Sequence, residues 1–154
     1  MEVEINNSSV IIKKIKANET RELRHSILRP TILAEKLVYY GDEANDTLHV
    51  GAFLNGEQIG IASICQEAKP NEENNKAWRL RGMGVKSEYR SLGVGNKLLA
   101  NCMEHVKNHG DGAYIWCNAR IKAINFYKEN GFIIVSDVFE IEDIGLHYNM
   151  EKHF

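Results

Sequence analysis

The sequence lacks an excess of charge of either sign. Its 154 residues include 19 basic and 21 acidic side chains, for a net charge of −2 at pH 7. Proteins that bind nucleic acid or membrane surfaces usually carry a basic patch or tail. We therefore expect no nucleic-acid partner and no membrane partner, and any anion site has to be built locally.

Cysteine is also scarce. The sequence contains Cys65, Cys102 and Cys117, each within an apolar run. Their spacing matches no zinc-binding pattern, so we predict no metal site. Buried free thiols in a reducing compartment are the expected state of all three.

Long apolar runs are missing as well. None approaches the roughly 20 residues that a membrane-spanning helix needs. The N-terminus is polar, with Glu2, Glu4 and Asn6, so we expect no signal peptide and a cytoplasmic location. With 44% hydrophobic and 26% charged residues and no repeat, linker or low-complexity segment, the chain predicts a single domain over residues 1–154.

The most informative stretch of the sequence begins at Trp78. Trp78 and Leu80 alternate as in a half-buried strand, but the next apolar pair is Met83 and Val85. A strand cannot exchange its two faces without an extra residue, so the change of phase predicts a β-bulge within residues 81–84. A bulge leaves backbone N–H groups unpaired and splays the strand from its neighbour, which suits an extended ligand that carries amides.

A glycine-containing loop follows this strand. It consists of Arg90, Ser91, Leu92, Gly93, Val94, Gly95 and Asn96. Apolar residues then recur every four positions from Val94 to Val106, which predicts a helix that ends near Gly110. Gly93 and Gly95 therefore sit at a helix N-terminus, where free N–H groups favour an anion and missing Cβ atoms let a pyrophosphate approach.

The loop pattern has other interpretations. Arg-x-x-Gly-x-Gly also occurs at ordinary strand–turn–helix junctions. A dinucleotide-binding loop fits less well, because Leu98 occupies the place of the third glycine and no strand with an acidic residue follows at the expected distance. A P-loop is excluded because Gly-Lys-Ser/Thr is absent. The bulged strand before the loop and the amphipathic helix after it favour an anion site.

The remaining sequence alternates between strand and helix patterns, which predicts an α/β fold with helices on both faces of a mixed sheet. Asn55-Gly56 is a type I′ hairpin signal. Predicted strands cover 9–15, 47–54, 58–66, a segment from 77, 113–117, 132–135 and 146–150, and predicted helices begin near 18–20, 31, 94 and 121.

Three motifs in order carry a resemblance to a known family. They are Leu80-Arg-Gly-Met83 with the loop at 90–95, Trp116-Cys-Asn-Ala-Arg120, and Ala123-x-x-Phe126-Tyr127 before Gly131-Phe132, with Gly145-x-His147-x-x-Met150 near the end. The chain resembles the GCN5-related N-acetyltransferase (GNAT) superfamily, in particular a small single-domain subgroup of mostly uncharacterised members. The resemblance covers most of the chain. It implies the acyl-CoA N-acyltransferase fold, a mixed, mostly antiparallel central sheet of about six to seven strands.

The resemblance also implies that acetyl-CoA is the acetyl donor. The Met83 N–H would polarise the thioester carbonyl, the backbone of Val85 would pair with pantetheine amides, and Asn118 would bond a pantetheine amide or else cap the next helix. The implied acetyl-CoA contacts are Met83, Gly84, Val85, Arg90, Ser91, Leu92, Gly93, Val94, Gly95, Asn96, Asn118, Ala123, Phe126 and Tyr127.

Tyr127 is the residue to which the resemblance assigns chemistry. When an amine attacks acetyl-CoA, the tetrahedral intermediate expels a thiolate, and a phenol with a pKa of about 10 can protonate it. The alternative is an aromatic side chain that only packs. Cys117 as a nucleophile is disfavoured, because no histidine that would activate it is near in the sequence.

The general base has two candidates, His147 and His49, which lie on predicted strands. Either is also compatible with a structural role, and Glu35 and Asp42 stay open. Candidate partners for an acceptor carboxylate or phosphate are Arg24, Arg81 and Arg120, unless they form exposed salt bridges.

We therefore predict an N-acetyltransferase that moves an acetyl group from acetyl-CoA to a primary amine by direct attack in a ternary complex. The alternative is a catalytically silent acyl-CoA-binding module or sensor. The acceptor is a small-molecule or peptide amine whose identity stays open; acidic residues at 42–46 hint at a cationic acceptor or form a solvated turn. A homodimer through a late strand or helix is a further expectation from the superfamily.

Overall fold

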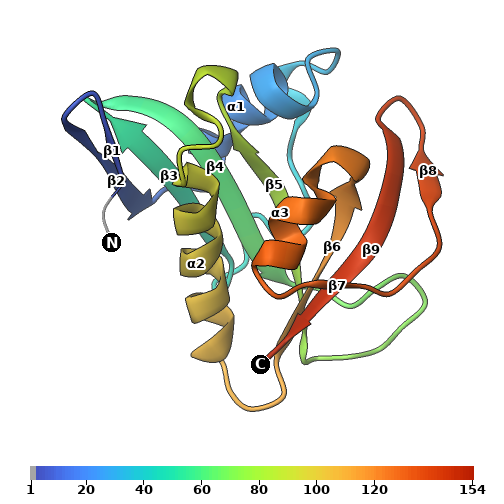
Figure 1. Cartoon of the computed structure of the whole chain (residues 1–154). Coiled ribbons are helices and arrows are strands. Elements are labelled where there is room, and N and C mark those ends of the chain that lie inside the picture. The colour runs from blue at the N-terminus through green and yellow to red at the C-terminus, as the bar shows by residue number, and fades with distance from the viewer. Residues whose placement is uncertain (1–2) are drawn as a thin grey trace.

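A twisted sheet of nine strands forms the centre of the computed structural model, which describes residues 3–154 (Figure 1). The strands are β1 (Glu4–Ile5), β2 (Ser8–Lys14), β3 (Leu48–Leu54), β4 (Glu57–Gln66), β5 (Ala77–Val85), β6 (Tyr114–Arg120), β7 (Ile133–Ile134), β8 (Phe139–Ile141) and β9 (Gly145–His153). Their order is β1-β2-β3-β4-β5-β6-β9-β7, and β8 also pairs with β9. Within this part of the chain β5–β6 is the parallel pair, and all other pairs are antiparallel.

The predicted mixed, mostly antiparallel sheet is confirmed, but it has more strands than the six to seven expected. The two strands that the sequence did not predict are β1 and β8, of two and three residues. Segments this short contain too few positions for an alternating pattern to be recognised. The hairpin at Asn55-Gly56 is confirmed, with positive φ angles of 50° and 83° at its two residues, as a type I′ turn requires.

Helices cover both faces of the sheet (Figure 1). The long helix is α2 (Val94–Lys107). The shorter helical segments are η1 (Ala17–Thr20), α1 (Arg21–Leu23), the π-helical η2 (Arg24–Leu28), η3 (Ala34–Lys36), η4 (Ser87–Tyr89), η5 (Ile121–Ala123) and α3 (Ile124–Glu129). The second helix predicted from Thr31 is reduced to the single 3-10 turn η3. Pro30 disfavours helical backbone in Arg29, whose φ and ψ are −138° and 66°, and the exposed Leu33 leaves this segment little apolar face to bury.

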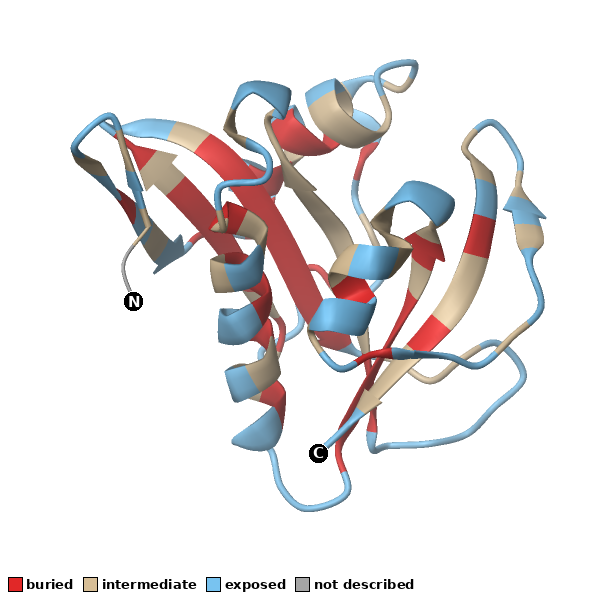
Figure 2. Cartoon of the chain, viewed as in Figure 1, coloured by how far each residue is buried: buried red, intermediate tan, exposed pale blue. Residues whose placement is uncertain are grey.

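The core lies mainly between the sheet and α2. Leu98, Leu99 and Cys102 of α2 are fully buried and belong to one cluster with Ala62 and Leu80 of the sheet. A smaller cluster on the opposite face joins Ile15 and Ile61 to Leu23 of α1. Figure 2 shows the buried residues as a band along the central strands and the inner side of α2. Among residues 3–154, no helix combines the length and apolar character needed to cross a membrane.

The predicted bulge lies in β5. Between the pairs Ile61–Gly84 and Ser63–Arg81, one residue of β4 faces two residues of β5. Such a bulge increases the local twist and takes a residue out of the ladder. The parallel pairing of β5 with β6 covers only Ala77–Arg79 of β5, so the two strands separate beyond this point. The separation opens the sheet next to the bulge.

Candidate functional site

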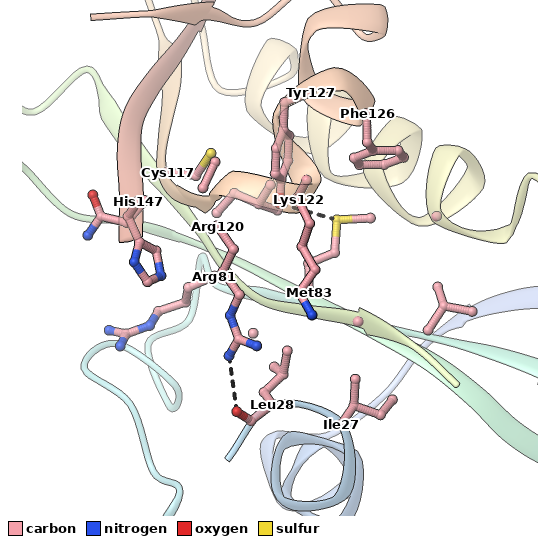
Figure 3. A pocket seen from close by; sticks show the side chains of 18 of the residues that line it. Ile27, Leu28, Arg81, Met83, Cys117, Arg120, Lys122, Phe126, Tyr127 and His147 are labelled. Carbon is pink, nitrogen blue, oxygen red and sulfur yellow. Dashed lines mark hydrogen bonds between the residues drawn. The ribbon is translucent and has the colours of Figure 1, made fainter. Parts of the chain in front are cut away.

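A cavity of about 870 Å³ occupies the opening between β5 and β6 (Figure 3). Its walls come from the bulged half of β5, the loop before α2, the end of β6, α3, the residues at the end of η2, and the β8–β9 hairpin. Elements far apart in the sequence therefore contribute to one cavity.

The helix N-terminus at this cavity has the features of an anion site. None of the described side chains caps the first turn of α2, so its backbone N–H groups are available to a ligand. Gly93 stands before the helix with a φ of 89°, in the left-handed region that glycine adopts without strain. A Cβ at Gly95 would lie 3.2 Å from the ring of Phe126, so a side chain would crowd the space there. Arg90 donates from Nε to the Val85 carbonyl, 3.0 Å away, which ties this loop to β5.

Most of the predicted acetyl-CoA contacts come together here. Those that line the cavity are Met83, Gly84, Val85, Arg90, Ser91, Gly93, Gly95, Asn96, Asn118, Ala123, Phe126 and Tyr127. Two do not line it: the Leu92 side chain is 48% exposed, and the side chain of Val94, the first residue of α2, is buried in the core. Asn118 does not cap the next helical segment, because Arg120 occupies the N-cap of η5, and its Oδ1 accepts from Asn149 Nδ2 at 3.1 Å.

The two faces of β5 point into different parts of the cavity. Met83 packs on the α2–α3 side, against the main core. Gly84 faces η2, and a Cβ at this position would lie 2.9 Å from Ile27 Cγ2. The glycine therefore permits the close approach of η2 to the strand. The cavity has one wall formed by α3 and an opposite wall formed by the end of η2, as Figure 3 shows with Tyr127 on one side and Leu28 on the other.

Tyr127 lies on the α3 wall. Its ring packs between those of Phe126 and Phe132, with centroid distances of 5.1 and 5.3 Å. The hydroxyl group lies 3.9 Å from Met83 Sδ, a weak acceptor. Burial, and next the thiols of Cys117 and Cys102, raise the pKa of Tyr127 well above 10, so the phenol stays protonated at neutral pH.

His147 lies on β9 and lines the cavity opposite the α3 wall. Its Nδ1 lies 2.7 Å from the Gly145 carbonyl oxygen. Because a carbonyl only accepts, Nδ1 carries the hydrogen in the neutral ring and Nε2 keeps a lone pair. In the antiparallel pair β6–β9, His147 is directly opposite Arg120, so both side chains project from the same face of the sheet.

His49 is not brought to this cavity. Its Nε2 donates to the Asp42 carbonyl oxygen at 2.9 Å, and its Nδ1 accepts from Ser63 Oγ at 2.6 Å. Both ring nitrogens are therefore engaged in a buried network. Glu35, one of the two carboxylates left open as the base, is exposed and does not line the cavity; Asp42, the second, does not line it either.

Arg24 is the centre of that buried network. It is fully buried and donates from Nη1 and Nη2 to the Asp42 carboxylate at 2.7 and 3.0 Å. Burial alone would raise the pKa of Asp42, but hydrogen bonds from Arg24 and the Tyr39 N–H outweigh it and lower that pKa. A Cβ at Gly82 would lie 3.2 Å from Arg24 Nε, so the network supports the bulge from below. Asp42 is thus paired, and residues 42–46 do not line the cavity. The idea of a cationic acceptor bound by these residues stays a prediction to which this cavity adds no support.

Sequence reasoning missed Tyr39. This side chain lines the cavity, and its ring lies between two guanidinium groups, with Arg24 Cζ at 3.9 Å and Arg81 Cζ at 4.1 Å from its centroid. Tyr39 belongs to an irregular loop, so no periodic pattern marked it. Lys122 and Arg29 also line the cavity without having been singled out.

The three cysteines are free and buried, as expected. Burial raises the pKa of Cys65, Cys102 and Cys117 to about 12 each. Thiols that stay protonated at neutral pH are poor nucleophiles. Among residues 3–154, no three histidine, cysteine, aspartate or glutamate side chains are grouped so as to hold a metal ion.

Comparison with known proteins gives the family. Residues 11–154 match the acetyltransferase (GNAT) domain family. The uncharacterized N-acetyltransferase YitI of Bacillus subtilis (strain 168) is 35% identical over 141 residues, 92% of this chain and 94% of the relative. Among solved structures, Escherichia coli ElaA superimposes with a TM-score of 0.75 at 19% identity. The aligned region includes 94% of this chain and 99% of the ElaA chain. An aminoglycoside 6′-N-acetyltransferase complexed with coenzyme A has a TM-score of 0.72 at 16% identity, over 92% and 96% of the two chains.

The match to the family includes strands β3 to β9, the bulge and the loop at the start of α2, and the relative with 35% identity aligns over 92% of this chain. The arrangement of these elements in the solved neighbours is the acyl-CoA N-acyltransferase fold. The chain belongs to the GNAT family and is an acetyltransferase.

Proposed function

We propose that this acetyltransferase moves an acetyl group from acetyl-CoA to a primary amine by direct attack in a ternary complex. The observation that carries the proposal is the phenol of Tyr127, buried in the opening between β5 and β6 and directed at the bulge residue Met83. A phenol held there can reach a thioester that enters the opening. The coenzyme A complex of the similar aminoglycoside 6′-N-acetyltransferase supports the choice of donor.

The uncapped first turn of α2 holds the pyrophosphate in this proposal. Its N–H groups and the positive end of the helix dipole favour the anion, and Arg90 adds a positive charge beside it. Leu92 and Val94 then contribute only backbone groups, because their side chains point elsewhere. When bound, acetyl-CoA supplies the acetyl group as a thioester.

The bulge in β5 binds the reacting end. The Met83 N–H donates to the thioester oxygen, on which negative charge collects as the amine attacks. The backbone of Gly84 and Val85 pairs with the pantetheine amides as an added strand would, while Asn118, Ala123 and Phe126 line the arm.

Two proton transfers complete the reaction. His147 accepts the proton of the amine at Nε2, directly or through a water molecule, because its Nδ1 is held as a donor by the Gly145 carbonyl. The new C–N bond forms at the carbonyl carbon, the C–S bond breaks, and the electron pair leaves with sulfur. Tyr127 donates its hydroxyl hydrogen to that sulfur, which leaves as the thiol. His49 takes no part, since both of its ring nitrogens are engaged elsewhere.

The second candidate function is a catalytically silent acyl-CoA-binding module. The same loop and bulge would bind the ligand in this case, and Tyr127 would only pack against Phe126 and Phe132. Turnover separates the two functions.

The test measures ligand binding first and turnover second. Thermal unfolding is followed with acetyl-CoA, CoA, NADH and ATP in parallel. A ligand that binds the folded state stabilises it by about 2.7 kcal/mol at a hundred times its Kd. We expect acetyl-CoA to raise the midpoint and amines then to release thiol from it. No shift with millimolar acetyl-CoA would contradict the proposal, and a shift without thiol release by any amine would favour the silent module.

The remaining expectations stay predictions. Exposed apolar side chains of β7 and the following loop, Ile133, Val135 and Val138, are compatible with a homodimer through this edge, which size-exclusion chromatography with light scattering would test. A cytoplasmic location, a single domain over residues 1–154 and the absence of nucleic-acid and membrane partners are also predictions.

A further inference from the structure

The η2 side of the cavity is a compartment separate from the α3 wall. Within the bulge, Met83 faces α3, whereas Arg81, just before the bulge, lies over Tyr39 on the opposite face. On β6, Arg120 projects to that same opposite face, where its Nη2 donates to the Leu28 carbonyl oxygen at 3.0 Å. We call the group formed by Tyr39, Arg81, Arg120 and His147 the acceptor compartment; all four line the cavity.

The two arginines of this compartment form no ion pair with a carboxylate of the described residues. In the described part of the chain, carboxylates pair with two neighbouring arginines: Asp42 with Arg24 at 2.7 Å and Glu67 with Arg79 at 3.0 Å. No carboxylate oxygen of residues 3–154 lies within 4.0 Å of a nitrogen of Arg81 or Arg120.

The acidic residue that lines the cavity lies on the α3 wall, away from the acceptor compartment. Of the residues that line the cavity, Glu129 is the acidic one, and it lies in the last turn of α3. It therefore does not neutralise the acceptor compartment, which contains two guanidinium groups and a histidine.

Both guanidinium groups are partly desolvated. Burial, and next the charge of Arg79, lower the pKa of Arg81, and burial followed by Arg29 lowers the pKa of Arg120. The Nε atom of Arg81 is buried and has no hydrogen-bond partner among the described residues. Within residues 3–154, the Nε atoms of Arg24 and Arg79 also have no partner, but those two side chains pair with carboxylates, whereas Arg81 makes no ion pair. Buried polar groups usually have partners, so a guanidinium that lines a cavity with neither an ion pair nor an Nε partner indicates a ligand.

We propose that the acceptor of this enzyme is a primary amine that carries a carboxylate, and that Arg81 and Arg120 bind this carboxylate. The inference rests on the proposed function and specifies its substrate class. A planar carboxylate matches the fork of a guanidinium group, which donates two parallel hydrogen bonds to it. Because His147 is directly opposite Arg120 in the sheet, a carboxylate at Arg120 brings an amine only a few atoms away to the base, as in an amino acid.

The test compares acceptors that differ only at the carboxylate. Each amino acid is measured against its own carboxamide by thiol release from acetyl-CoA with the wild-type enzyme. We expect the amino acid to be the better substrate, with kcat/KM higher by about ten- to a hundredfold, the range of a charge-assisted hydrogen-bond pair. An aminoalkyl phosphate serves as a second anion and distinguishes a carboxylate from a phosphate.

Variants then assign the preference to the two arginines. In Arg81→Gln and Arg120→Gln, the ratio of kcat/KM for the amino acid to kcat/KM for its carboxamide falls by about ten- to a hundredfold, mainly through the KM of the amino acid. Arg81→Lys keeps the charge without the fork and recovers only part of the loss. The matched control is Lys13→Met, which removes one positive charge from an exposed position of β2 outside the cavity.

The outcomes separate this inference from the proposed function. Equal or faster reaction of the carboxamides, or preference for the aminoalkyl phosphate, overturns the inference and leaves the acetyltransferase mechanism intact. No turnover of any amino acid, with acetyl-CoA still raising the unfolding midpoint, also overturns it. No acetyl-CoA shift at all is instead a failure of the proposed function. If an arginine variant does not fold, the comparison of amino acid with carboxamide in the wild-type enzyme decides by itself whether the acceptor carries a carboxylate.

Discussion

The hydroxyl group of Tyr127 lies 3.9 Å from the sulfur of Met83, so the side chain from α3 meets the bulge of β5 across the opening between β5 and β6. A thioether is a weak hydrogen-bond acceptor, so the hydroxyl group of Tyr127 can readily rotate to donate to a stronger acceptor. This contact connects the helix that supplies the proposed acid to the strand that supplies the proposed oxyanion donor.

The variant Tyr127→Phe tests the acid directly. Removing the hydroxyl should lower kcat by about 10²- to 10⁴-fold, the contribution of a positioned proton donor. The free energy of unfolding should change by less than about 1 kcal/mol, because only a weak hydrogen bond is lost. Steady-state thiol release and urea denaturation measure the two quantities. Full turnover in the variant would remove this role.

The same residue also makes a pH prediction. Because burial raises the pKa of Tyr127 above 10 in the folded state, the phenol keeps its proton when exposed tyrosines ionise. A raised folded-state pKa contributes stability that is complete below pH 10 and is lost as the pH rises toward the folded-state pKa. The tyrosinate absorbance of wild type and Tyr127→Phe should therefore coincide up to about pH 10. A difference between the two curves below that pH would contradict the buried phenol.

The variant His147→Gln tests the proposed base. Without Nε2 as proton acceptor, kcat at neutral pH should fall by about 10²-fold. The residual rate should rise with pH, since the amine then has to lose its proton to solvent before attack. The pH profile of kcat for variant and wild type measures this. A merely structural role would lower the rate equally at every pH.

The contact between Gly84 and Ile27 makes a stability prediction. A Cβ at Gly84 would lie 2.9 Å from Ile27 Cγ2, so Gly84→Ala should destabilise the fold by about 1–3 kcal/mol through overpacking. The double variant Gly84→Ala/Ile27→Ala lacks the opposing Ile27 atom. Its loss of unfolding free energy should therefore be smaller than the sum of the losses in the two single variants. Urea denaturation of the four proteins gives the coupling, and strict additivity would show that the two positions do not meet.

The buried ion pair Arg24–Asp42 gives a second stability prediction. Asp42→Asn leaves the Arg24 charge without its partner and should cost about 3–5 kcal/mol. The control is Glu57→Gln in the exposed pair with Lys86, 2.8 Å apart, which should cost less than about 1 kcal/mol. Similar costs for the two variants in urea denaturation would contradict the assignment of Arg24 as a buried structural charge.

The pH dependence of stability follows from the same pair. The pKa of Asp42 is lowered in the folded state, so its contribution is present above the ordinary value of 3.8 and is lost as the pH falls through the folded-state pKa. Wild type should therefore lose stability in acid more steeply than Asp42→Asn. Parallel acid profiles of the two proteins would rule out this linkage.

Local patterns were enough for much of the fold. The phase change between Leu80 and Met83 predicted the bulge, Asn55-Gly56 predicted the hairpin, and all seven predicted strands are present, although β6 and β9 extend three residues beyond the predicted ends. These features depend on backbone sterics and on the alternation of neighbouring residues, which the sequence contains directly. The motifs around the loop before α2 likewise depend on adjacent residues.

Only the tertiary structure decided which distant side chains meet. The sequence could not show that Asp42 pairs with Arg24, that Tyr39 stacks on Arg81, or that His147 faces the cavity while His49 does not. The charge of a binding compartment depends on which arginines are already paired, and pairing is set by the packing of loops onto the sheet. The sequence by itself determined the fold family and the glycine-containing loop before α2, and the tertiary structure decided which arginines at the cavity remain without a carboxylate partner.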